Sequence, residues 1–294
     1  MCGSPPSLQT FSGPELLIVN RIHWFVLCLT VMFSLVSAAS GQPGSSNQSN
    51  SHAEVTHASA GAAAPELDRQ AASILHKAQD ALGGLRRLQA IHDVTREVEM
   101  VNLTTKEKAS ATSQIIFPDV IRLTTDSPFG ELIAFSDGKA AWASSSLGTD
   151  ERLPDWQLKA SRLDMFRQLE SLLQSDRNPD RKVEFAKRGK VDTKPADILK
   201  ISSASTGIVR IWVDATSGDV VEMEYQRVVV RGAGPMVTDF FSDYRWVNKT
   251  VRVPFHIHTL SDGQPYMDTQ VLHADYNRGL KIEALSQKPA PKQH

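Results

Sequence analysis

Apolar residues recur every three or four positions early in this chain, and that spacing predicts a helix. The helix starts at Pro65, because proline suits the first turn of a helix. Its regularly spaced apolar residues are Leu67, Ala71, Ile74, Ala78 and Leu82. Gly83 and Gly84 follow and end it. A second window of the same period, residues 155–173, predicts another helix that ends before Asn178-Pro179.

Strand-like segments fill most of the remaining chain. Those before the second helix are predicted over residues 94–103, 111–117, 120–125, 132–136 and 139–143. Three turn dipeptides interrupt the strand-rich regions, namely Asp137-Gly138, Ser217-Gly218 and Asp262-Gly263. Glycine can adopt the positive φ of a tight hairpin, so neighbouring strands are expected to be antiparallel. The order helix, sheet, helix, sheet predicts an α+β fold and argues against a parallel βαβ fold.

Several of these strands are apolar on both faces. In the hairpin around Asp137-Gly138, one face carries Leu132, Ala134 and Ala141, and the other carries Ile133, Phe135 and Trp142. In residues 237–247, alternation groups Phe240, Tyr244 and Trp246 against Val237, Phe241 and Val247. A sheet with two apolar faces needs cover on both sides. Either both faces are packed core, or the interior of a curved sheet is incompletely filled and accepts an acyl chain or similar ligand.

The beginning of the chain has the pattern of a secretory signal peptide. An apolar run over residues 24–36 follows Arg21 and precedes the small residues Ser37-Ala38-Ala39. We therefore expect a signal peptide over residues 1–39, with residues 1–18 as a candidate misassigned start. The run is shorter than the roughly 20 apolar residues of a membrane span. No stable span is expected after cleavage, and the protein is expected in the periplasm or secreted.

Composition divides the rest of the chain. Residues 40–64 are polar and small without any apolar period, which predicts a disordered linker. A single domain over residues 65–289 and a flexible tail over residues 290–294 would follow. Cys2 and Cys28 both precede the expected cleavage site, so the mature protein would contain no disulfide. The residues before Cys28 are too large for a lipid-attachment motif.

Net charge and the absence of catalytic motifs argue against nucleic-acid-binding proteins and enzymes. The net charge is −1, which argues against an electrostatic nucleic-acid partner. No zinc-protease, nucleophile-elbow, C-x-x-C or phosphate-loop motif occurs. His256 and His258 alternate along one strand, but a metal site needs a third ligand. A two-residue turn at Asp262-Gly263 would place Met267 opposite His258 and Thr269 opposite His256, which leaves His273 too far along the strand to be that ligand. We therefore expect no metal site, no cofactor and no enzyme.

Several short phrases resemble the LolA-like family of bacterial envelope proteins. They include Ala81-Leu82-Gly83-Gly84 at the start of the domain and, near its end, Trp212-Val213-Asp214, Phe241-Ser242-Asp243-Tyr244, Val253-Pro254-Phe255, and Asn277 with Leu280. The resemblance implies a curved antiparallel sheet that forms an unclosed half-barrel with covering helices. It also implies a carrier of lipids or lipid-modified proteins, or a sensor of envelope state. These phrases are structural, so they transfer no binding residue.

The leading hypothesis is a soluble periplasmic carrier that shelters a lipid or lipidated partner in the concave apolar face. The residues expected to line that face are aromatic: Phe135, Trp142, Trp212, Phe240, Tyr244 and Trp246. The alternative is an envelope sensor or protein-interaction module that uses the same fold without lipid transport and holds an envelope protein partner.

Overall fold

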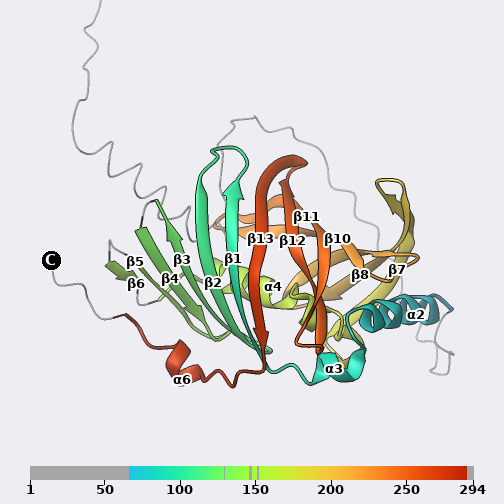
Figure 1. Ribbon diagram of the computed structural model, residues 1–294, viewed down its shortest axis with the longest axis horizontal. Coiled ribbons are helices and arrows are strands. Elements are labelled where there is room, and N and C mark those ends of the chain that lie inside the picture. The colour runs from blue at the N-terminus through green and yellow to red at the C-terminus, as the bar shows by residue number, and fades with distance from the viewer. Residues whose placement is uncertain (1–65, 129, 146–147, 151, 290–294) are drawn as a thin grey trace, which may run out of the picture.

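The computed structural model describes residues 66–128, 130–145, 148–150 and 152–289. The proposed signal peptide, linker and tail lie outside these residues. In the described part, the strands form one antiparallel sheet of thirteen, in the order β6-β5-β4-β3-β2-β1-β13-β12-β11-β10-β9-β8-β7. The two halves of the sheet curve toward each other around α4, and the edge strands β6 and β7 do not pair (Figure 1). The expected unclosed half-barrel is therefore confirmed.

The first half of the sheet is a meander of consecutive hairpins. Its strands are β1 (Asp93–Asn102), β2 (Lys108–Ile116), β3 (Val120–Ser127), β4 (Gly130–Ser136), β5 (Ala141–Ser145) and β6 (Gly148–Asp150). The second half contains β7 (Arg181–Val191), β8 (Lys194–Ser203), β9 (Gly207–Asp214), β10 (Val220–Val229), β11 (Gly232–Val247), β12 (Val251–Ser261) and β13 (Gln264–Tyr276). The pairing of β1 with β13 joins the halves.

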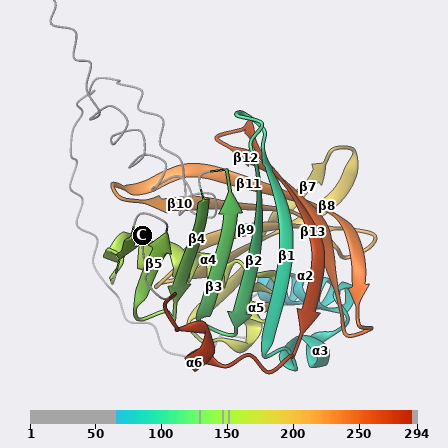
Figure 2. The same ribbon diagram turned by 60° about the vertical axis from the view of Figure 1, so that its left-hand side comes forward.

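Short helices accompany the sheet on different sides. They are α2 (Glu66–Ala81), α3 (Leu85–Gln89), α4 (Asp155–Phe166), α5 (Leu169–Leu172) and α6 (Ile282–Leu285), with a 3-10 turn over Ser175–Arg177. The helix α2 packs against β7 and β8, α4 packs against β10, and α6 packs against β3. Figure 2 shows α6 in front of the strands β3 and β4, while α4 lies behind them.

The helical window over residues 155–173 was expected to be continuous, and that expectation is wrong. The helix α4 ends at Phe166, and Gln168 leaves helical geometry with φ −57° and ψ 128° before α5 begins. The Arg167 side chain turns back to Asp164 of α4, with Nε donating to Oδ1 at 2.9 Å. The Gln168 amide also donates to the Asp164 carbonyl oxygen at 3.1 Å. The break thus places two polar side chains beneath the helix rather than along its surface.

The C-terminal phrase of the resemblance fastens the two ends of the domain. The Asp93 carboxylate at the start of β1 accepts hydrogen bonds from the backbone N–H groups of Arg278, Gly279 and Leu280. The Asn277 side chain, in turn, accepts from the N–H of His92 at 2.8 Å. Because both residues sit where β1 and β13 meet, this contact fixes the seam between the two halves of the sheet.

Gly218 is the position where the β9–β10 turn touches α2. Its φ is +80°, and a Cβ there would lie 2.8 Å from the Lys77 carbonyl oxygen. We expect Gly218→Ala to destabilise the fold by the cost of a left-handed residue, about 1–2 kcal/mol, and by a further ~1–3 kcal/mol of overpacking. Gly263→Ala is the matched control, since Gly263 has φ +75° and no atom within 4 Å. Equal losses in urea unfolding would contradict the close contact with α2.

Candidate functional site

A cavity of about 210 Å³ lies between α4 and the concave face of the sheet. A single water needs about 10–15 Å³ of such space, so this cavity is much larger than a packing defect. It is below the roughly 300–1,000 Å³ of pockets that hold drug-sized ligands. These dimensions suit one slender chain better than a bulky ring system.

Most of the lining is apolar and comes from both halves of the sheet. The central residues are Val98, Met100, Ile115, Leu123, Ala134, Phe241, Val253, Ile257, Met267 and Val271. Leu169 of α5 contributes from the helical side. These strands are far apart in sequence, and only the curvature of the sheet brings them together. Most of these side chains also belong to the main hydrophobic core, so the cavity is an unfilled part of that core.

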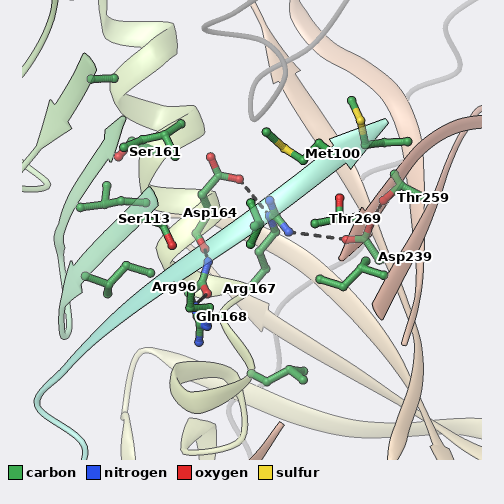
Figure 3. A pocket seen from close by; sticks show the side chains of 18 of the residues that line it. Arg96, Met100, Ser113, Ser161, Asp164, Arg167, Gln168, Asp239, Thr259 and Thr269 are labelled. Carbon is green, nitrogen blue, oxygen red and sulfur yellow. Dashed lines mark hydrogen bonds and ion pairs between the residues drawn. The ribbon is translucent and has the colours of Figure 1, made fainter. Parts of the chain in front are cut away.

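Two groups of buried charges interrupt this lining. In the first, shown in Figure 3, Arg167 pairs with Asp164 at 2.9 Å and with Asp239 at 3.5 Å. Asp239 also accepts a hydrogen bond from the Thr259 hydroxyl at 2.7 Å. Burial raises the pKa of the Asp164 carboxyl, and the attraction of Arg167 offsets this only in part. This carboxyl therefore holds a proton more readily than a solvated aspartate.

The second group centres on Glu170, whose side chain is 2% exposed. It accepts a hydrogen bond from the Tyr276 hydroxyl at 2.5 Å and forms an ion pair with Arg96. The other guanidinium nitrogen of Arg96 donates to the Gln168 side chain at 3.0 Å. Burial alone would raise the pKa of Glu170, but Arg96 and Tyr276 hold it below its ordinary value. The group ties α5 to β1 and β13 and bounds one end of the cavity.

Phe135 and Trp142 lie mainly on the face opposite the cavity. The expected two faces of their hairpin are confirmed, with Leu132 and Ala143 in one cluster and Phe135 and Trp142 in another. Phe135 borders the cavity, but its ring stacks on that of Trp142 with centroids 5.8 Å apart. Leu285 of α6 covers this stack. Trp142 is therefore part of the packing beneath α6 and does not line the cavity.

Trp212 and Phe240 also face away from the cavity. Trp212 pairs across the sheet with Ile198 and Glu222, whereas its neighbours Ile211 and Val213 enter the core. The Phe240 ring lies 6.5 Å from that of His258, on the opposite side of β11 from the cavity-lining Phe241.

Tyr244 and Trp246 occupy two further environments. Tyr244 packs on the core and donates its hydroxyl hydrogen to the Val220 carbonyl oxygen at 2.6 Å. Trp246 is 52% exposed, with the Arg87 guanidinium 5.7 Å from its ring. The shared face expected for Phe240, Tyr244 and Trp246 is wrong. Asp243 adopts φ +54°, which interrupts regular alternation between Phe240 and Tyr244. Of the six expected aromatics, only Phe135 borders the cavity.

His256 and His258 meet Asp268 on the outward face. Their nitrogens lie 2.9 and 3.4 Å from the same Asp268 oxygen. The expected register, with His258 opposite Met267, is wrong by one residue because the pairing of β12 with β13 shifts beside Thr259. Among the described residues, no group of three His, Cys, Asp or Glu side chains could hold a metal ion.

Comparisons with known proteins identify the fold. An outer membrane lipoprotein-sorting protein domain from Vibrio parahaemolyticus is similar over 74% of this chain and 97% of that chain, with a TM-score of 0.50 and 14% identity. A LolA superfamily protein from Nitrosomonas europaea gives the same coverage and TM-score at 13% identity. No protein-family model matches the sequence. No curated protein matches it either. The chain has the LolA-like fold.

In the part of the chain that the structure describes, no helix is both long and apolar enough to cross a membrane.

Proposed function

We propose that this protein is a periplasmic or secreted binding protein that shelters an acyl chain of a lipid or lipid-modified protein. The observation that carries the proposal is the unfilled apolar cavity between α4 and the concave sheet. The signal-like segment over residues 24–36 supports the location. The LolA-like fold supports a carrier or an interaction module rather than an enzyme.

Burial of the acyl chain would provide the affinity without a chemical step. Each methylene group removed from water contributes about 0.8 kcal/mol. About fourteen methylenes would thus contribute roughly 11 kcal/mol before the costs of association, which are about 4 kcal/mol or more. The remainder corresponds to a dissociation constant no tighter than about 10 μM by hydrophobic contact alone. Binding of this strength permits release, as a carrier requires.

Lipid analysis of the purified protein tests this proposal. The chain from Ser40 onward would be secreted into a bacterial periplasm, purified and extracted with organic solvent. Mass spectrometry against a mock purification is expected to show lipid at near-equimolar amounts. A lipid-free protein that also binds no added amphiphile would contradict it and favour the alternative, an envelope sensor or interaction module. A stable protein partner in a pull-down would support that alternative.

A further inference from the structure

Arg227 of β10 is a buried cation at the cavity that forms no close ion pair with any carboxylate of the described residues. The residue is 8% exposed and lines the cavity. Among the described residues, no carboxylate oxygen lies within 4.0 Å of its guanidinium. Its side-chain partner is Tyr266, whose ring centroid is 5.3 Å from Cζ and whose neutral hydroxyl forms a hydrogen bond with the guanidinium. A cation–π contact contributes about 0.5–2 kcal/mol, whereas burying an unpaired ion costs several kcal/mol.

The backbone around Arg227 departs from regular pairing. Gln226 pairs with Met236 and Val228 with Ala233, so β11 carries one more residue than β10 over this stretch. Gly234 lies within that bulge, and a Cβ there would lie 3.0 Å from the Arg227 carbonyl oxygen. Bulges commonly redirect a side chain beside a binding site. The bulge in the β10–β11 pairing therefore lies at Arg227, the residue whose guanidinium lines the cavity.

Arg227 and the Glu170 group lie toward opposite ends of the cavity. Tyr266 is beside the β1–β2 turn, since its carbonyl oxygen accepts from the Leu103 N–H at 2.9 Å. Arg96, the partner of Glu170, precedes Leu103 by seven residues in the chain. At the rise of a strand, this separates the two backbone positions by roughly 23 Å. Val98 and Met100 line the cavity between these ends. The layout suits an amphiphile, with the unpaired cation at one end and a mostly apolar lining between it and the paired charges of the Glu170 group at the other.

The nearby carboxylates form their close ion pairs with Arg167 rather than with Arg227. Asp164 and Asp239 share Arg167, and the more distant Arg227 also attracts Asp164. Burial nevertheless raises the pKa of Asp164. Both carboxylates lie within 4.0 Å of Arg167, and neither lies within that distance of Arg227. An arriving anion would therefore meet in Arg227 a guanidinium that forms no close ion pair with them.

We propose that the cavity binds single-chain amphiphiles with an anionic head group, such as a fatty-acid carboxylate, and that Arg227 binds this head group. The planar guanidinium can donate two parallel hydrogen bonds to a carboxylate, and such charge-assisted bonds are about twice as strong as neutral ones. This inference rests on the proposed function, because it specifies the ligand of the same cavity.

Binding of hexadecanoate and of hexadecanol, measured by displacement of a fluorescent acyl probe, tests the inference. The wild-type protein is expected to bind hexadecanoate at least tenfold more tightly than hexadecanol. Arg227→Met should remove this preference while changing hexadecanol affinity less than threefold. Arg227→Lys, which keeps the charge but loses the planar fork, should retain part of the preference. Arg210→Met is the control, since Arg210 is half-exposed and pairs with Glu224 on the outward face.

The outcomes separate this inference from the proposed function. Equal affinity of the wild-type protein for the acid and the alcohol would overturn the role of Arg227 and leave acyl-chain binding in place. Failure to bind either ligand would overturn both. A preference that survives in folded Arg227→Met would show that another group binds the anion. If Arg227→Met does not fold, the Lys variant decides, and an unchanged preference there would contradict recognition by the planar guanidinium.

Discussion

Replacing Glu170 with alanine is expected to lower the free energy of unfolding by about 3–5 kcal/mol, the usual cost of breaking a buried ion pair. The substitution would leave the Arg96 guanidinium buried without its carboxylate and the Tyr276 hydroxyl without its acceptor. Urea denaturation followed by circular dichroism measures the loss. It is the largest stability effect that we expect from a single substitution in this cavity.

Glu184→Ala is the matched control for this prediction. Glu184 forms ion pairs with Lys182 and Lys200, and its side chain is 26% exposed, compared with 2% for Glu170. Exposed pairs contribute about 0–1 kcal/mol, so this variant should differ little from wild type. A loss below about 1 kcal/mol for Glu170→Ala would mean that the Arg96–Glu170 group does not hold α5 to the sheet.

The same group gives the protein a defined acid sensitivity. Because the folded pKa of Glu170 is held below its unfolded value of about 4.3, its ionised form stabilises the fold above that pH. This stabilisation is lost as the pH falls through the folded pKa. The difference in stability between wild type and Glu170→Gln should therefore shrink on acidification below about pH 4.

Replacing Thr269 with phenylalanine is expected to weaken acyl-chain binding at least tenfold. Thr269 lines the cavity on β13, between Met100 of β1 and Ile257 of β12. A phenyl ring there would occupy space that at least two ligand methylenes would otherwise fill. Two methylenes contribute about 1.6 kcal/mol, which slightly exceeds a tenfold change in affinity. Titration with a fluorescent fatty acid provides the dissociation constants.

Leu272→Phe is the control on the same strand, because Leu272 is 52% exposed and does not line the cavity. It should leave the dissociation constant unchanged. Urea unfolding of both variants would separate lost binding from lost folding, since overpacking costs about 1–3 kcal/mol. Unchanged binding by folded Thr269→Phe would place the ligand elsewhere.

The sequence predicted the antiparallel sheet well because turn dipeptides and alternating apolar residues are local features of the chain. The hairpins were predicted from turn dipeptides, and their glycines Gly138, Gly218 and Gly263 all adopt the expected positive φ. The first predicted helix is confirmed as α2 over Glu66–Ala81, and the two faces of the β4–β5 hairpin were assigned correctly. These features depend on residues close together in the sequence, so the spacing of apolar residues and turn glycines predicts them.

The residues of the cavity were harder to predict because alternation does not tell which face is concave. Large aromatic side chains were predicted to line the concave face, yet Trp142 packs under α6 and Trp212 faces outward. The charged lining residues gave a weaker signal. Arg96 and Glu170 are far apart in sequence and meet only after the sheet has curved. Asp243 adopts a positive φ between Phe240 and Tyr244, and because it is not a glycine the sequence did not predict this irregularity.

The most direct test of the account is the position of a bound acyl chain in a crystal structure. A fatty acid with a terminal bromine, co-crystallised with the protein, would mark the chain by anomalous scattering. We expect the bromine inside the cavity, beside apolar lining residues such as Val98 and Val271. A bromine on the outward surface, for example beside Trp246, with the cavity filled by the protein's own side chains, would contradict the account.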